Sequence, residues 1–516
     1  MSSLESMSDI TPSSLSSKYT YRLVLKTIFE RDDDGVGLFG ERVVIGGWVK
    51  ISKELKVIKE KSDMQNLSPP LYSMLEVNDG SSVKNLQVLV DSKLESPEKV
   101  MPTGTCIVVE GILQKASTEG KHHIELLANK ILHLGTVDKN EYLLTRRTLP
   151  LTVLRNYPHL QPRTAQMTSI MRMHNSAFTA LRTFYQANGF LYVQVPIITD
   201  IDTRESDKKF HVIVATNEDQ RKKEENAGEE EMSGNKEEDG YMESQDYFSE
   251  LMHLTSSGHF HLQSQASALG NVYTYGPFFR PDPPYGIKSL AEMWKVETEM
   301  AFSQLEDAMD CAEDLLKFMC KWILEKCIED VMFLSKPTAT TLIEELQLVT
   351  SSSFKRISYR KLLEDMNAVS INEELGIVME FGHVLIEGRL LMHVVTNIYK
   401  RPVIVYDHPK ELKPFHVRLN DDGKTVASFD IFFPHVGFVL SGSQSEERLD
   451  TLISRIEEVG LRQEQLKWYL DLRKHGNTTH SGFSLKLDSL LLYAGGFKDL
   501  GDVAPFPKYH SDSESE

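Results

Sequence analysis

The chain has 516 residues, 41% of them hydrophobic, and a formal net charge of −18 at pH 7. This length allows two or three domains with full-sized cores, at roughly 100 to 200 residues each. The negative charge argues against a broad nonspecific nucleic-acid surface, because neutralising phosphates requires clustered lysine and arginine. Any contact with RNA is therefore expected to be local.

Three further features exclude other classes of protein. Four cysteines without a C-x-x-C pair indicate structural thiols in a reducing compartment rather than a disulfide or zinc framework. Acidic and basic residues interrupt the most apolar helical stretch, residues 312–327, so no membrane span is expected. Residues 1–17 contain acidic residues and no arginine, unlike a transit peptide, which leads us to expect a cytoplasmic location.

The first part of the chain, residues 19–137, alternates in the manner of short strands and follows a terminus, residues 1–18, that we expect to be disordered. The turn signal Asn78-Asp79-Gly80 separates two of the strands. Strands are predicted at residues 21–25, 42–50, 71–77, 86–90, 106–110 and 124–127. This pattern predicts an OB-fold β-barrel, a fold that binds oligonucleotides on one face.

From Arg163 the apolar spacing becomes that of a helix, which is predicted to end near Asn188-Gly189 before a strand at 190–195. Residues 216–246 are charged and of low complexity, so we expect a disordered insertion there. Mixed strands and helices continue to residue 507. The sequence thus predicts an α+β domain over 163–508, with a linker at 138–162 before it and an acidic tail at 509–516 after it.

Signature motifs occur in this larger region, and they resemble those of class II aminoacyl-tRNA synthetases. GFLYVQVPIIT (189–199) resembles the first motif, residues 273–299 around Phe279-Arg280 resemble the second, and HSGFSLKLDSLLLYAGGFKDLGDVAPFP (480–507) resembles the third. VRLNDDGKTVASFD (417–430) and SGSQSEERLD (441–450) are similar to asparagine–tRNA ligases, and the plant cytoplasmic enzymes look nearest. The resemblance covers about residues 20–210 and 245–508.

This resemblance implies a fold and a reaction. The barrel corresponds to the anticodon-binding domain, and the catalytic domain is expected to be built on an antiparallel sheet flanked by helices. The reaction is the ATP-dependent attachment of asparagine to its tRNA through an aminoacyl-adenylate. The cofactors implied are ATP and Mg²⁺, and the partners are tRNA and a second subunit, in a homodimer or in a heterodimer with an active relative.

Some of the family's nucleotide-binding positions are kept. The catalytic positions of the second motif fall on Arg280, which is expected to meet the α-phosphate, and on Asp282, which replaces a glutamate. Further ATP-binding candidates are Lys288, Asp430, Gln444 and Arg448. Asp430 is also the magnesium candidate, but Phe438 replaces the family's second carboxylate, and a phenyl ring cannot bind a metal. Weakened binding of ATP and Mg²⁺ is therefore expected.

Other positions are altered where the family binds its substrates. An ammonium group in a dry pocket needs a carboxylate, but Arg204 reverses the charge of the family's glutamate, with Glu205 as the alternative partner. Ser445 cannot reproduce the fork of an arginine. Ser489 replaces the arginine that clamps the far phosphate. His259 and Gln263 replace a glutamine and a glutamate, and the pair His259 and His261 lacks a third zinc ligand.

In the barrel, Tyr72 falls where the family stacks an aromatic ring on an anticodon base, and Gln87 falls on a strand position that faces the RNA. The alternative for Tyr72 is a ring packed on its own sheet. Three functions remain open: an asparagine–tRNA ligase with an altered site, a catalytically inactive paralogue that binds tRNA or serves as a dimer partner through residues 163–196, and a different adenylating enzyme. No residue pattern positively supports the third.

Overall fold

The computed structural model describes residues 19–56, 71–117, 123–145, 149, 151–201, 208–213, 248, 251–281, 290–335, 339–372, 379–382 and 388–508. The expected disordered terminus (1–18), the insertion (216–246) and the acidic tail (509–516) lie outside these residues. The chain divides into two compact units. Unit 1 comprises Met1–Asn175 and Cys327–Ala339, and unit 2 comprises Ser176–Lys326 and Thr340–Glu516.

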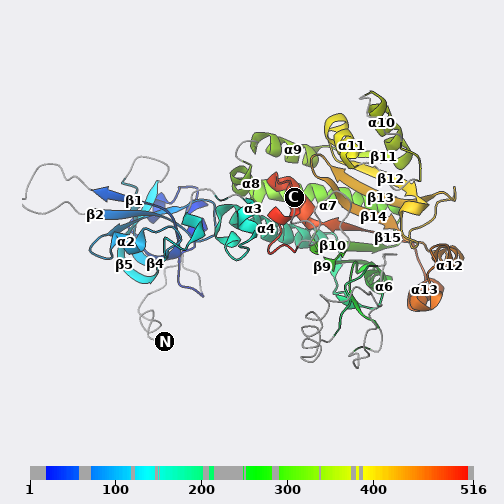
Figure 1. Ribbon diagram of the computed structural model, residues 1–516, viewed down its shortest axis with the longest axis horizontal. Helices are drawn as coiled ribbons and strands as arrows, with labels where there is room; N and C mark the ends of the chain where they lie inside the picture. Colours follow the sequence, from blue (N-terminus) through cyan, green and yellow to red (C-terminus); the bar gives the residue numbers. More distant parts are fainter. Residues whose placement is uncertain are drawn as a thin grey trace, which may run out of the picture. The chain divides into compact units, whose positions relative to one another are not determined.

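Unit 1 contains a closed five-stranded barrel, drawn in blue to cyan in Figure 1. Its strands are β1 (Arg42–Lys56), β2 (Leu71–Asn78), β3 (Leu86–Asp91), β4 (Cys106–Lys115) and β5 (Ile124–Gly135), paired in the order β1-β2-β3-β5-β4. Alternate apolar residues such as Ile45, Val88 and Leu126 fill the interior, as a period of two predicts. The OB-type barrel predicted from the sequence is therefore confirmed.

The strand predicted at residues 21–25 is wrong. A short helix, α1 (Leu25–Phe29), begins there instead, and Leu25 and Ile28, three residues apart, are its buried side chains. Only Leu23 bonds to the barrel strands in this segment, through its N–H to Val44 O at 2.7 Å. The Asp79 carboxylate accepts the N–H of Leu25 at 2.9 Å, a donor that a helix start leaves without a partner.

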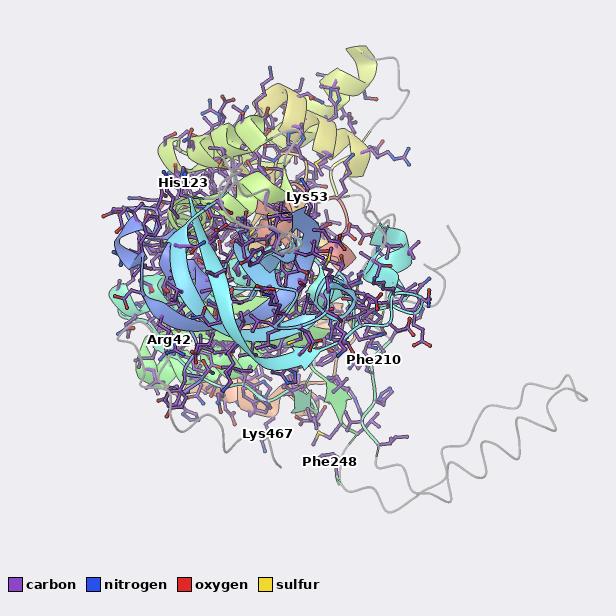
Figure 2. The ribbon with its side chains drawn as sticks, turned by 90° about the vertical axis from the view of Figure 1, so that its left-hand side faces the viewer. Arg42, Lys53, His123, Phe210, Phe248 and Lys467 are labelled. Carbon is purple, nitrogen blue, oxygen red and sulfur yellow. The ribbon has the colours of Figure 1, made fainter. Side chains whose placement is uncertain are left out.

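Short helices complete unit 1: η2 (Val36–Leu38), α2 (Pro97–Val100), η3 (Leu143–Thr145), α3 (Leu151–Arg155), η4 (Gln161–Arg163) and α8 (Ile328–Leu334). Figure 2 turns the barrel toward the viewer, with Arg42 and Lys53 labelled near opposite ends of β1. Arg172 ties α8 to this unit, because its guanidinium bonds to Asp330 Oδ1 at 2.6 Å and to Gly80 O at 2.7 Å.

Unit 2 is built on an eight-stranded sheet of order β11-β12-β13-β14-β15-β10-β9-β6. All neighbours are antiparallel except β11 with β12 and β6 with β9. The strands are β6 (Leu191–Tyr192), β9 (Asn271–Phe279), β10 (Glu292–Ala301), β11 (Lys355–Ser358), β12 (Val403–Pro409), β13 (Thr425–Phe433), β14 (Gly437–Gln444) and β15 (His480–Lys486). A separate pair joins β7 (Ile198–Thr199) to β8 (His253–Leu254).

Helices flank this sheet, and the predicted α+β class is therefore confirmed. They are α4 (Ala165–Ala187), α6 (His259–Leu269), α7 (Leu305–Lys326), α9 (Ala339–Ser351), α10 (Tyr359–Asn372), α11 (Gly388–His393), η5 (Val394–Tyr399), η6 (Lys410–Leu412), α12 (Leu449–Glu458), η7 (Gln463–Leu466), α13 (Lys467–Lys474), α14 (Leu487–Gly495) and η8 (Leu500–Asp502). None of the helices in the described part of the chain has the length and apolar character needed to cross a membrane.

Alternate residues of β10 project to opposite faces of the sheet. On one face, Thr298 Oγ1 lies 2.5 Å from the hydroxyl of Tyr185 on α4. On the other face, Glu297 accepts the N–H of Gly258, at the start of α6, at 2.8 Å. In Figure 1, α6, α12 and α13 lie below the sheet. Lys295, Glu297 and Glu299 therefore share the face that carries α6.

Arg172→Leu should destabilise unit 1 by about 3 kcal/mol, because it leaves the largely buried Asp330 carboxylate without its partner. Urea unfolding followed by circular dichroism measures this change. Lys84→Ala is the matched control, since the Lys84–Glu329 pair has side chains 46% and 49% exposed and should contribute about 1 kcal/mol or less. Equal losses in the two variants would contradict the prediction.

Candidate active-site pocket

A cavity of about 490 Å³ opens on the α6 face of the sheet in unit 2. Its charged and polar lining comes from the start of α6, from β9 and β10, from the segment after η6, and from β13, β14 and β15. The lining residues that matter chemically are Ser257, His259, Arg280, Lys295, Glu297, Lys413, His416, Asp430, Phe438 and Lys486.

Two glycines allow the strands that line the cavity to lie close to the strands and rings beside them. A Cβ atom at Gly482 on β15 would lie 2.1 Å from Thr298 O and 2.5 Å from Glu299 Oε2. A Cβ atom at Gly442 on β14 would lie 2.3 Å from Phe429 Cε1. Neither position can carry a side chain without moving a neighbouring strand or ring, so the close approach of these strands requires glycine.

Asp430, the magnesium candidate, is already neutralised by protein groups. Lys413 Nζ lies 2.8 Å from one carboxylate oxygen and 2.7 Å from the other, and His408 Nε2 lies 3.1 Å from Oδ2. Burial alone would raise the pKa of Asp430, but Lys413 and then His408 outweigh burial and hold the pKa well below its ordinary value. The carboxylate is therefore charged and engaged with an ammonium group.

Phe438 stands at the mouth of the same cavity, with a cation over its ring. Lys486 Nζ lies 4.8 Å from the centroid of the Phe438 ring, within cation–π range. No set of three or more metal-ligating side chains gathers within the described ranges. The donor set around Asp430 does not fit a magnesium ion, because magnesium requires oxygen ligands and an ammonium group occupies the carboxylate.

Beside it, Lys295 and Glu297 form a buried ion pair on β10. Lys295 Nζ lies 2.7 Å from Glu297 Oε1 and donates to Ser256 O at 2.9 Å. The Ser257 hydroxyl also donates to Glu297. Burial would raise the pKa of Glu297, but Lys295, followed by the hydrogen bonds from Ser257 and Gly258, lowers it overall. This carboxylate too is charged and fully occupied by protein donors.

Glu299 lies deeper, two residues along β10, and is fully buried. Gln263 Nε2 on α6 donates to Glu299 Oε1 at 3.0 Å. His259 Nδ1 lies 3.4 Å from Oε2, and His480 Nδ1 on β15 lies 3.9 Å from Oε1. Burial raises the pKa of Glu299 to about 8, although Gln263 and Arg473 act in the opposite direction. The carboxyl group is therefore mainly protonated at pH 7.

The histidines around Glu299 are neutral. Burial lowers the pKa of His259 and of His480 to about 4 each, and Arg473 adds to both shifts. Burial also lowers the pKa of His416 well below its ordinary value, with His259 and Arg473 as further causes. Arg473 itself donates to the backbone oxygen of Glu446 at 3.0 Å and to the Tyr469 hydroxyl at 2.8 Å. Its charge therefore has no carboxylate partner among the described residues.

The structure brings together some of the predicted nucleotide-binding residues. Arg280, Asp430 and Phe438 line the cavity. Gln444 and Arg448 are absent from its lining and are bonded elsewhere. Gln444 Oε1 accepts the N–H of Leu305 at 3.2 Å, and Arg448 bonds to Glu446 at 2.7 and 2.9 Å. Asp282, Lys288 and Arg204 lie outside the described residues.

The two serines that the sequence predicts at positions of family arginines are both buried. Ser445 is 1% exposed, and its hydroxyl has no hydrogen-bond partner among the described residues. Ser489 is 5% exposed on α14 and does not line the cavity.

In the barrel, the two anticodon candidates differ. Tyr72 is half-buried on β2, with Leu55 and Asp91 as its cross-strand neighbours. Gln87 on β3 is 2% exposed, and its amide donates to Glu125 Oε2 at 2.6 Å. Gln87 alternates with the interior residues Leu86 and Val88, so it lies on the outer face of β3, where its amide is engaged with Glu125.

Sequence reasoning missed several residues of the site. The run Lys295-Val-Glu297-Thr-Glu299 carried a usable signal, because a period of two within a predicted strand places three charges on one face. Lys413, His416 and Arg473 carried no such signal. Their roles depend on neighbours that are distant in sequence, such as Asp430 for Lys413.

Comparisons with known proteins agree with this geometry. The model of class II tRNA synthetases (D, K and N) matches residues 151–510. Asparagine–tRNA ligase, cytoplasmic 2, of Arabidopsis thaliana is 36% identical, covering 97% of this chain and 97% of the relative. Asparagine–tRNA ligase of Synechocystis sp. is 35% identical, covering 93% and 97%.

The fold comparison gives the same answer. The asparaginyl-tRNA synthetase from Pyrococcus horikoshii, complexed with asparaginyl-adenylate, has a TM-score of 0.74 at 22% identity over 95% of this chain and 98% of that chain. This likeness shows a common fold. Together with the closed barrel, the helix-flanked sheet and the family match, the sequence identities establish that the chain belongs to the class II tRNA synthetases and, within them, to the asparagine–tRNA ligase family.

Proposed function

We propose that this chain is an asparagine–tRNA ligase homologue that keeps a nucleotide pocket but no longer activates asparagine at a normal rate. One observation supports the loss. The carboxylates of the described cavity lining, Glu297 and Asp430, are each neutralised by a lysine, and Glu299 behind them is mainly protonated. An α-ammonium group entering this pocket therefore meets no free anion among the described lining residues, and burying it costs several kcal/mol.

The nucleotide end of the pocket retains positive charge. Of the four basic residues that line the cavity, Lys295 and Lys413 are paired with Glu297 and Asp430, and Arg280 and Lys486 are the phosphate candidates. Arg280 is the candidate for the α-phosphate, and Lys486 on β15 is the candidate for a far phosphate. We propose that these cations bind ATP without a magnesium ion held by Asp430, because Lys413 already occupies that carboxylate.

The alternative function is that of an inactive paralogue that binds tRNA or pairs with a relative. The closed barrel favours it, because OB-type barrels bind oligonucleotides, and Tyr72 offers a partly exposed ring on β2. Relatives from Arabidopsis thaliana are named cytoplasmic, and we place this chain in the same compartment.

A dimer is part of this proposal. Aromatic rings form a continuous patch beside the sheet edge at β6: Phe178 lies 5.2 Å from Tyr275, Tyr275 lies 5.0 Å from Trp294, and Tyr192 lies 5.5 Å from Tyr273. Phe178, Tyr192 and Trp294 are 42%, 50% and 41% exposed. Exposed aromatic clusters of this kind mark interfaces, and we propose a second class II chain, a copy of this one in the simplest case, as the partner.

Asparagine-dependent ATP–pyrophosphate exchange should stay at the level of a no-enzyme control. Neither Arg204→Glu nor Ser445→Arg alone should restore it, because the nucleotide pocket is altered at the same time. A cytoplasmic asparagine–tRNA ligase from Arabidopsis thaliana, prepared in parallel, is the positive control. Asparagine-dependent exchange well above the no-enzyme control would refute the proposal.

ATP binding should be weak and should change less than about twofold when Mg²⁺ is added, because Lys413 holds Asp430. Lys486→Met should weaken binding about tenfold, as expected for the loss of one charge-assisted phosphate contact. Isothermal calorimetry measures both effects, and Lys467→Met, on the exposed side of α13, is the charge-matched control. Tight ATP binding that requires Mg²⁺ would show that another carboxylate holds the metal.

Sedimentation velocity at micromolar concentration should show a dimer, and Phe178→Asp should convert it to a monomer by placing a charge in the aromatic patch. Phe302→Asp is the matched control, since Phe302 is 81% exposed and has no ring contact in the aromatic patch. A monomeric parent chain, or equal dissociation of both variants, would contradict this prediction. Copurification with a relative would identify the heterodimer instead.

A further inference from the structure

Behind the cavity lies a group of buried polar side chains, each with one atom that lacks a hydrogen-bond partner among the described residues. These atoms are His259 Nε2, Gln263 Oε1, Glu299 Oε2, His416 Nδ1, Ser445 Oγ and His480 Nδ1. A buried polar group left without a partner costs about 1 to 3 kcal/mol. Six such atoms in one place indicate that a bound molecule supplies the missing partners.

The six side chains form one continuous set, here called the deep subsite. Glu299 lies at its centre, within 3.0 to 3.9 Å of Gln263, His259 and His480. The ring centroids of His259 and His416 are 5.0 Å apart. The backbone of Ser445 lies beside the remaining two, because its N–H donates to His480 O at 2.9 Å and the N–H of the next residue, Glu446, donates to His416 O at 2.8 Å. Since His259 and His416 also line the cavity, the deep subsite adjoins it.

Five of the six free atoms are able to donate. The Ser445 hydroxyl and the protonated Glu299 carboxyl each carry an O–H, and each neutral imidazole carries one N–H, which lies on its free nitrogen in one of the two tautomers. The same groups accept in their other arrangements, and Gln263 Oε1 only accepts. The deep subsite can therefore present up to five donors to an anionic ligand.

The fixed charges point in the same direction. Arg473 on α13 acts on His259, His416, His480 and Glu299, and the described residues give it no carboxylate partner. The Lys295–Glu297 pair carries no net charge. The potential at the deep subsite is therefore positive, which favours an anion and opposes an ammonium group.

Building on the proposed function, we propose that the deep subsite binds the carboxylate of a small organic acid that lacks an α-ammonium group. Several neutral donors and one nearby guanidinium can satisfy such a carboxylate, whereas an amino acid brings a cation that has no counter-charge there. The chain would then keep the pocket of its family and recognise a different class of small molecule in it.

Three probes separate the two charged groups of asparagine. Succinamate is asparagine without the α-ammonium, and 3-aminopropanamide is asparagine without the carboxylate. Calorimetric titration of the full chain at pH 6.5 should show binding of succinamate, with asparagine at least tenfold weaker and 3-aminopropanamide not bound. Asparagine or the amine binding as tightly as succinamate would overturn the inference.

The failure of this inference is distinguishable from the failure of the proposed function. If none of the three probes binds and asparagine-dependent pyrophosphate exchange is absent, the inference is wrong and the proposed function stands. If asparagine supports exchange, the proposed function is wrong whatever succinamate does.

The pH dependence gives a second test. The groups that face Glu299 are His259 and Gln263 from α6, His480 from β15, Arg473 and Tyr469 from α13, and Glu297 on its own strand. A carboxyl group whose pKa is about 8 becomes an anion above that pH and then repels a bound carboxylate. Succinamate binding should be constant between pH 6.5 and 7 and should weaken up to about tenfold per pH unit above pH 8.

Glu299→Gln keeps a hydrogen-bonding side chain but cannot ionise, so its succinamate affinity should stay level up to pH 9. A decline above pH 8 that is the same in this variant and in the parent chain would assign the titration to another group and overturn the role given to Glu299.

Two serines supply a matched pair of variants that leave the charges untouched. Ser445 in the deep subsite and Ser73 in the barrel are both buried, with hydroxyls that lack hydrogen-bond partners among the described residues. Ser445→Ala should weaken succinamate binding about fivefold, the effect of one lost neutral hydrogen bond. Ser73→Ala should leave binding unchanged. Equal affinity in both variants and the parent chain would show that the carboxylate does not contact Ser445.

Discussion

The close pairing of β10 with β15 at Gly482 determines the geometry of the whole pocket. Because Gly482 carries no side chain, the backbone and carboxyl of Glu299 can occupy the space opposite it. The pleat of β10 then places Lys295, Glu297 and Glu299 on one face and Thr298 on the other, where the Thr298 hydroxyl is hydrogen-bonded to Tyr185. A larger residue at 482 would displace both the floor of the cavity and the strand that supports it.

This geometry explains why protein side chains neutralise the charged groups of the pocket. Three carboxyl groups on the α6 face lie in water-poor surroundings, and they are neutralised in two ways. Asp430 and Glu297 each pair with a lysine within 2.7 Å, and Glu299 remains protonated beside neutral histidines. None of the three is thus left as an unpaired buried anion, which would be costly.

The sequence predicts much of the fold because the signals are local and periodic. Barrel strands with alternating residues and the helix α4 follow from patterns within 10 to 20 residues. The strand expected at 21–25 fails because a helix begins at Leu25, whose N–H bonds to Asp79, and the Leu23 N–H alone in this segment bonds to a barrel strand through its backbone. Gln87 is bonded to Glu125, a contact across 38 residues that no local pattern contains.

The residues of the candidate site were likewise predicted only in part. Arg280, Asp430, Phe438 and His259 all reach the cavity, because motif positions are fixed by strand register. Gln444 and Arg448 do not line it, because Gln444 accepts the N–H of Leu305 and Arg448 donates to Glu446. The sequence predicted that Ser445 would lack one contact to the substrate. In the structure its hydroxyl belongs to a group of buried atoms without hydrogen-bond partners among the described residues. This group includes His416 and His480, which the motifs did not single out.

Two residues of the pocket also fit one another. Phe438 on β14 presents a phenyl ring, and Lys486, on the neighbouring strand, places an ammonium group over that ring. With an acidic residue at 438 this lysine would form an ion pair, and with a glycine at 486 the phenyl ring would lose its cation. Side chains that contact each other in this way couple energetically, typically by 0.5 to 3 kcal/mol. The altered residues therefore behave as a set, with the core contacts of Tyr185, Tyr273 and Phe433 on the opposite face left intact. Because the sheet is held from that face, the chemistry of the pocket can change while the fold of the family persists.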